Sequence, residues 1–180
     1  MLSFFLFLLK HKWYVFLAGC LYTKTPLFQL IIHDWSKFTP VEFNCYRKKH
    51  QKLPFDTLDM ETAWLNHQNH NHHHWEYWLS RTGHGNEGVS IRETPIEMPE
   101  KYIREMVSDW MAASRTYGKE KDWAQVGYNW SWLKEHGVKK MRGRLHPNTI
   151  KGLNKVFREI HYKQTLLDED ELFTNYLKKY

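Results

Sequence analysis

The sequence predicts an all-α protein that forms one domain over residues 1–180. Apolar residues recur at helical spacing almost throughout, and we find no convincing alternation of the kind that strands show. The chain is long enough to enclose a core of its own, and a composition with 42% hydrophobic and 16% aromatic residues excludes disorder for the chain as a whole. We therefore expect a single helical bundle.

The first predicted helix covers residues 3–22, with Ser3 as its N-cap. It is strongly apolar, but Lys10-His11-Lys12 interrupts it, which argues against a membrane span and against a secretory signal. The segment Leu17-Ala18-Gly19-Cys20 resembles a lipoprotein cleavage box, so processing at Cys20 is an alternative. We favour a buried first helix in a cytoplasmic protein, because two cysteines make no disulfide framework.

Start and stop signals place the other helices. Pro26 suits the first turn of a helix that runs into His33. Thr39 as N-cap, with Glu42 placed for a capping box, starts a helix over residues 40–50. Asp59 can cap the next helix. The remaining predicted helices cover residues 60–69, 72–80 after a break at Asn71, 99–117, 119–135, 147–162 and 168–180, with a long loop over residues 82–98 and a basic loop over residues 137–144.

The adjacent pair His33-Asp34 is the centre of the strongest chemical pattern in the chain. It offers an imidazole nitrogen and a carboxylate oxygen to one small volume, although such dipeptides also arise by chance. Further candidate ligands flank the pair in sequence order: His11, His67, His73, His74 and Asp109. Mixed nitrogen and oxygen ligands of this kind suit one or two divalent transition metals, such as Zn, Mn, Fe, Ni or Co.

The histidine-rich segment 67–74 leaves several ligand sets open. If one helix runs through it, His67, His70 and His74 share a face. If Asn71 breaks the helix, His73 and His74 begin a new one instead. A solvated histidine cluster without a metal is the alternative to both.

Three further candidates have ordinary structural alternatives. Asp109 shares a helix face with Glu105 among apolar neighbours, so its carboxylate must be paired, hydrated or metal-bound. Lys37 follows His33 by one turn and could meet a phosphoryl oxygen or be a surface lysine. His11 could equally be a hydrogen-bonded core residue.

The net charge of +6 and the pI of about 9.2 favour an anionic ligand. The basic residues form two separate clusters, 47–52 and 139–144, which is thin support for a continuous nucleic-acid-binding face. We expect a small anionic substrate of the nucleotide class, and neither a nucleic-acid polymer nor a membrane as partner. A homo-oligomer stays open.

These residues resemble a known family. The order His11, His33-Asp34, His67, His73-His74, Asp109 is similar to that of the HD superfamily of all-helical metal-dependent phosphohydrolases, and His33-Asp34-Trp35-Ser36-Lys37 resembles its His-Asp-x-x-Lys form. The chain resembles more closely a family of small, uncharacterised HD-like proteins of bacteria and phages. The matching segments are residues 11–16, 33–38, 71–78, 98–102, 105–110 and 145–147.

The resemblance implies an HD-like helical bundle with a metal site and, as the first expectation, hydrolysis of a small phosphate ester. It implies that His11, His33, Asp34 and Asp109 hold the first metal. His67 with His73 or His74 would hold a second metal or stabilise charge on the transferring group, and Lys37 would neutralise developing charge. His67 and His73 lie closer in sequence than the matching histidines of dinuclear HD enzymes, so His70, His73 and His74 stay open as the sixth ligand. An HD-type di-iron oxygenase and a non-enzymatic metal-stabilised binding module are the alternatives.

Overall fold

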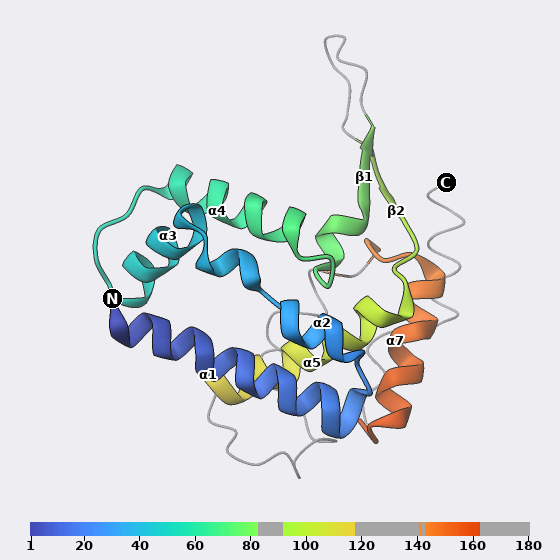
Figure 1. The fold of residues 1–180 in the computed structure, drawn as a ribbon. Coiled ribbons are helices and arrows are strands. Elements are labelled where there is room, and N and C mark those ends of the chain that lie inside the picture. The colour runs from blue at the N-terminus through green and yellow to red at the C-terminus, as the bar shows by residue number, and fades with distance from the viewer. Residues whose placement is uncertain (83–91, 118–140, 142, 163–180) are drawn as a thin grey trace.

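A computed structural model describes residues 1–82, 92–117, 141 and 143–162, and this part of the chain is mostly helical, as predicted (Figure 1). The predicted helices over residues 119–135 and 168–180, and most of the predicted loops over residues 82–98 and 137–144, lie outside the described residues. The α-helices are α1 (Leu2–Ala18), α2 (Leu27–Ile32), α3 (Pro40–His50), α4 (Thr57–His70), α5 (Glu100–Tyr117) and α7 (Pro147–Glu159).

Helix α5 is the centre of the packing. Its buried side chains include Ile103, Met106 and Trp110, and they form one core with residues of α7 such as Leu153 and Phe157. Helix α1 packs against the other side of α5 (Figure 1). Because α5 also carries Glu105 and Asp109, this packing brings α1 and α5 to a common site.

Helix α1 is apolar on two sides. The side that packs inward consists of Phe4, Leu8, His11, Val15 and Ala18, spaced three to four residues apart. Leu6 and Trp13 are exposed on the other side. The prediction of a buried first helix is therefore correct for one face only. By length and composition the helical stretch Leu2–Thr23 could cross a membrane, although 33% of its most apolar window is buried within the protein.

A π-helical turn, Gly19–Thr23, follows α1 and reverses the chain toward α2. Gly19 is buried there, and a Cβ atom added to it would lie 2.4 Å from Leu30 Cδ2. Any larger residue here would press on the Leu30 side chain, so glycine suits this close approach of the turn to α2. Helix α2 ends at Ile32, directly before the His33-Asp34 pair.

Several predicted helix caps are wrong. Helix α1 begins at Leu2 with Met1 as N-cap, so Ser3 lies inside the helix. Thr39 is the N-cap of α3 as predicted, but its side chain makes no capping hydrogen bond, and Glu42 is buried instead of forming a capping box. Asp56, rather than Asp59, caps α4 by accepting a hydrogen bond from the Leu58 amide. Asn71 does end α4, as predicted.

The prediction of a helix over residues 72–80 is also wrong. The chain instead forms a short 3-10 helix, Trp75–Trp78, and then strand β1 (Leu79–Thr82). Strand β1 pairs antiparallel with β2 (Arg92–Pro95), with Leu79 opposite Pro95, so the expectation of no strand fails here (Figure 1). Aromatic residues at i and i+3 suit a 3-10 turn as well as an α-helix, so Trp75 and Trp78 could not distinguish the two.

Candidate metal centre

The backbone at the end of α2 turns two consecutive side chains toward one place. His33 is extended, with ψ of 127°, and Asp34 has the left-handed values φ 54° and ψ 23°. Aspartate adopts this conformation more readily than most residues. Lys12 Nζ donates hydrogen bonds to the carbonyl oxygens of Ile31 and His33, at 2.7 and 2.6 Å, and so holds the end of α2 against α1.

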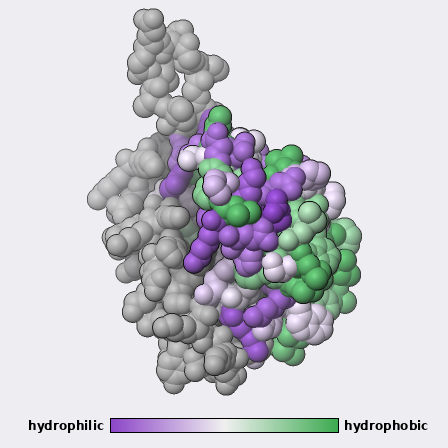
Figure 2. Space-filling model, turned by 90° about the vertical axis from the view of Figure 1, so that its left-hand side faces the viewer, coloured by the Kyte–Doolittle hydropathy of each residue, from purple (hydrophilic) through white to green (hydrophobic). Residues whose placement is uncertain are grey.

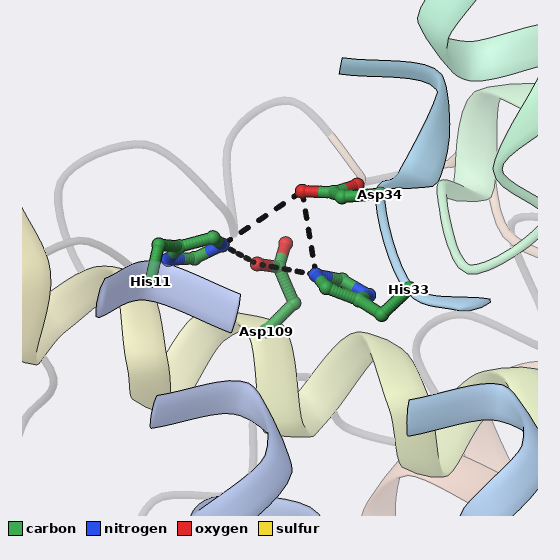
Figure 3. Close-up of side chains that lie close together, drawn as sticks. All are labelled: His11, His33, Asp34 and Asp109. Atoms are coloured by element: carbon green, nitrogen blue, oxygen red, sulfur yellow. Dashed lines mark ion pairs between the residues drawn. The ribbon is translucent and has the colours of Figure 1, made fainter. Parts of the chain in front are cut away.

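Four side chains from three segments form the first group (Figure 3). His11 comes from α1, His33 and Asp34 follow α2, and Asp109 comes from α5. His11 Nε2 lies 2.9 Å from Asp109 Oδ1 and 3.8 Å from Asp34 Oδ2. His33 Nε2 lies 3.3 Å from Asp34 Oδ2 and 3.7 Å from Asp109 Oδ1. Ligands about 2.1 Å from one ion lie about 3.0–3.4 Å apart in octahedral or tetrahedral geometry, close to these spacings.

A second group uses the other oxygen of the same aspartate. Asp34 Oδ1, His67 and His74 form it, with His67 Nε2 3.4 Å from Asp34 Oδ1 and 2.9 Å from His74 Nε2. His73 lies between the two groups, with Nε2 3.6 Å from Asp34 Oδ1 and 4.0 Å from Asp109 Oδ2. The structure thus brings both His73 and His74 to the centre, and Asp34 connects the two groups.

His70 does not join the centre. It is exposed, and its Nδ1 contacts the carbonyl oxygen of Asn66 within its own helix. The candidate of a continuous helix with His67, His70 and His74 on one face is therefore wrong, because α4 ends at His70 and Asn71 turns the chain. His74 reaches the centre from the segment that follows this turn.

Unpaired polar atoms meet in the middle of the cluster. Among the described residues, four buried side-chain atoms of the two groups and of His73 between them have no hydrogen-bond partner: Nε2 of His11, His33 and His73, and Oδ1 of Asp34. The close contact between His11 and Asp109 lacks hydrogen-bond geometry. Since buried polar groups are normally satisfied, this convergence fits a divalent metal ion, which would coordinate these lone pairs.

Two buried glutamates orient the imidazoles from behind. Glu105 Oε1 lies 3.0 Å from His33 Nδ1 and 3.2 Å from His73 Nδ1. Glu42 Oε2 accepts from His67 Nδ1 at 2.8 Å. A carboxylate acceptor fixes the proton on Nδ1, so Nε2 points its lone pair into the centre, which is the usual arrangement of metal-binding histidines. Neither glutamate was predicted for this role; the i, i+4 spacing of Glu105 and Asp109 was the one signal for the first.

The electrostatics depend on the carboxylates. Burial alone would lower the pKa of His33, but Asp34, Glu105 and Asp109 outweigh it and raise that pKa to about 10. Burial likewise opposes ionisation of Asp109, yet His11 and His33 hold its pKa well below the usual range. Burial, with His73 and His67 nearby, lowers the pKa of His74. A metal ion at the first group would therefore replace a proton on His33.

Lys37 contacts Asp34 directly. Its Nζ forms an ion pair with Asp34 Oδ2, and although burial would lower its pKa, Asp34 raises it above the ordinary lysine value. Lys37 also lines a small open pocket with Leu8, His11, Lys12, Asp34 and Phe38. The predicted anion-binding lysine thus lies beside the first group and borders the pocket that reaches it.

A family model matches residues 2–159, and the chain belongs to that family, a family of unknown function (DUF5662). The match covers every residue of both groups. Comparison with curated proteins and with solved structures finds no match.

Proposed function

We propose that this member of the family is an HD-like, metal-dependent phosphohydrolase that acts on a small phosphate ester such as a nucleotide. One observation carries the proposal: imidazole and carboxylate atoms from distant segments converge in the HD ligand order, and four buried atoms among them lack hydrogen-bond partners within the described residues. A purely structural cluster would be expected to satisfy its polar atoms internally.

The chain offers two adjoining ion sites. His11, His33, Asp34 Oδ2 and Asp109 would hold the first ion, and Asp34 Oδ1, His67 and His74 the second. His73 lies at the boundary, where it would join the second ion or hydrogen-bond to the transferring group. When bound, a divalent transition ion polarises a phosphoryl oxygen and lowers the pKa of water.

The pocket residues suit the phosphoryl group. Lys37 and Lys12 bring positive charge to its wall, and Leu8 and Phe38 contribute apolar surface. The pocket is small, with a volume of about 10 Å³, which is room for a single water-sized group. A single phosphoryl oxygen would fit this space, the rest of the substrate would lie outside the pocket, and Lys37 would neutralise the developing charge.

The test is metal content and turnover of the protein purified without a histidine tag. Asp34→Asn should remove metal from both groups, because Asp34 is the shared ligand, whereas Asp109→Asn should affect the first group alone. Asp59→Asn, an exposed aspartate on α4, is the matched control.

Elemental analysis is combined with a panel of nucleotides and simple phosphate esters. Release of inorganic phosphate that Asp34→Asn abolishes would support the proposal. Bound iron with oxygen consumption but no phosphate release would favour an oxygenase instead. Retained metal without any turnover would favour a metal-stabilised binding module.

A further inference from the structure

An apolar face covers the outer side of α1 and α2 and the turn that follows. We define the apolar face as Leu6, Leu9, Trp13, Phe28, Ile31 and Trp35. All six side chains are exposed, and Phe28, Trp13 and Trp35 expose 68%, 57% and 57% of their surface. Figure 2 shows hydrophobic surface gathered along one side of the molecule, apart from a hydrophilic band. Contiguous exposed apolar surface of this kind marks an interaction site.

The face has cationic flanks and no carboxylate of its own. Residues 1–33 contain Lys10, Lys12 and Lys24 but no aspartate or glutamate. The next two acidic residues, Asp34 and Glu42, are buried in the metal centre. Lys10 lies on α1 beside the exposed stripe, and Lys24 is exposed at the turn into α2. An apolar surface with lysines at its edge is complementary to anionic lipid head groups.

We propose that the apolar face lies on the surface of an anionic lipid membrane, with α1 parallel to that surface. Tryptophan side chains such as Trp13 and Trp35 favour the interface between lipid and water. A symmetric dimer through the same face is less favourable, because it would bring lysines toward lysines without a carboxylate between them. The charged interruption Lys10-His11-Lys12, which led us to expect no membrane partner, is compatible with a helix that lies on a membrane.

Helix α1 cannot span the bilayer and keep this fold. Its inner side, with Phe4, Leu8 and Val15, packs within the protein, and His11 reaches the metal centre from that side. A spanning helix would separate His11 from Asp109 on α5. On α1, only the outer stripe is therefore free to contact the membrane, together with the exposed residues of α2 and Trp35.

The pocket opens next to the apolar face. The Phe5 ring, on the exposed side of α1, contacts the Phe38 ring at a centroid distance of 6.0 Å, and Phe38 lines the pocket. Docking would therefore place the pocket mouth near the head groups. The further consequence rests on the proposed function: a phosphate ester carried by a membrane lipid would then reach the pocket.

The experiment is flotation of the full-length protein with two kinds of vesicle, phosphatidylcholine alone and equal parts of phosphatidylcholine and phosphatidylglycerol. The test variant combines Phe28→Ser with Ile31→Ser. The matched control combines Leu58→Ser with Leu65→Ser, two exposed leucines on α4. Metal content and circular dichroism of each variant report on folding.

We expect binding to the anionic vesicles that weakens with salt and falls about tenfold or more in the test variant, because its apolar contact is lost. The α4 control should bind like the unmodified protein. Failure to bind either vesicle would overturn the proposal, as would a dimer in sedimentation experiments that the test variant dissociates. Neither result depends on phosphate release, so the docking proposal and the proposed hydrolase function can fail separately.

Discussion

Replacing Glu105 by glutamine tests how the metal centre is supported. The Glu105 carboxylate lies within hydrogen-bonding distance of Nδ1 of both His33 and His73 through Oε1, and it accepts the Gln29 amide through Oε2 at 3.0 Å. Glutamine keeps the shape but has one accepting oxygen. If that oxygen faces the imidazoles, the new amide group opposes the amide of Gln29; if it faces Gln29, the new amide group opposes two imidazole N–H groups. As long as Gln29 keeps its orientation, a buried donor loses its acceptor either way.

The expected loss follows from this double role. Removing one hydrogen-bond partner of a metal-binding histidine typically costs about 10–100-fold in metal affinity, or about 1.4–2.7 kcal/mol. Glu105 supports two histidines, so we expect a loss near the upper value, about 100-fold. A buried donor without an acceptor should also destabilise the metal-free protein by about 1–3 kcal/mol.

The assay is a competition titration of zinc or manganese against a chromophoric chelator, with thermal unfolding measured in parallel. Glu100→Gln is the matched control, since Glu100 lies on the same helix but pairs with Arg104 and Lys155 at the surface. This control should leave metal affinity unchanged. If Glu105→Gln binds metal as tightly as Glu100→Gln while remaining folded, the supporting role assigned to Glu105 is wrong.

Three other predictions concern protons and packing. With a chelator present to keep the protein metal-free, the thermal unfolding midpoint should be highest near neutral pH. The pKa of His33 is raised from 6.5 to about 10, so its contribution to stability is lost as the pH rises through that range. The pKa of His74 is lowered, so its contribution to stability is lost as the pH falls below 6.5. A midpoint that stays constant from pH 6.5 to 10 would contradict this. Metal binding near pH 7 should release about one proton, seen as a buffer-dependent enthalpy in calorimetry; an enthalpy independent of the buffer would argue against it. Gly19→Ala should lower the free energy of unfolding by about 1–3 kcal/mol, because its Cβ would press on Leu30, and a denaturant midpoint equal to that of the unmodified protein would contradict the packing argument.

The sequence predicted the candidate metal ligands better than the two glutamates, Glu42 and Glu105, that orient them. An adjacent His-Asp pair with flanking histidines is a pattern of residue types in a given order, and it can be recognised in the sequence without knowledge of the fold. Glu42 shows why the supports were harder. At the third position of α3, Glu42 fits a capping box. Nothing in the local sequence indicates that its carboxylate instead accepts a hydrogen bond from His67, 25 positions away. Glu42 could cap its own helix or bind the distant His67, and which of the two it does depends on how α3 and α4 pack together.

The short strands were missed for a related reason. Ser80, Arg81 and Thr82 on β1 face Thr94, Glu93 and Arg92 on β2, so the paired residues are polar and show no apolar alternation. Likewise, because α1 is apolar on two sides, its sequence reads as one continuous hydrophobic run, and the side that packs inside the protein cannot be identified from it. Periodicity identifies a face only when the opposite face is polar.

The wide separation of the partners around the centre has a consequence for biosynthesis. His33 and Glu105 are 72 positions apart, and His11 and Thr116, whose side chains lie 3.4 Å apart, are 105 positions apart. At about 5–20 residues per second, the ribosome needs roughly 4–20 s to make the chain between such partners. During that interval the inner apolar side of α1 has no α5 to pack against, and the four residues of the first group cannot meet. The nascent helix must therefore be kept from aggregating until α5 emerges, and ion capture by the complete first group marks a chain synthesised through Asp109.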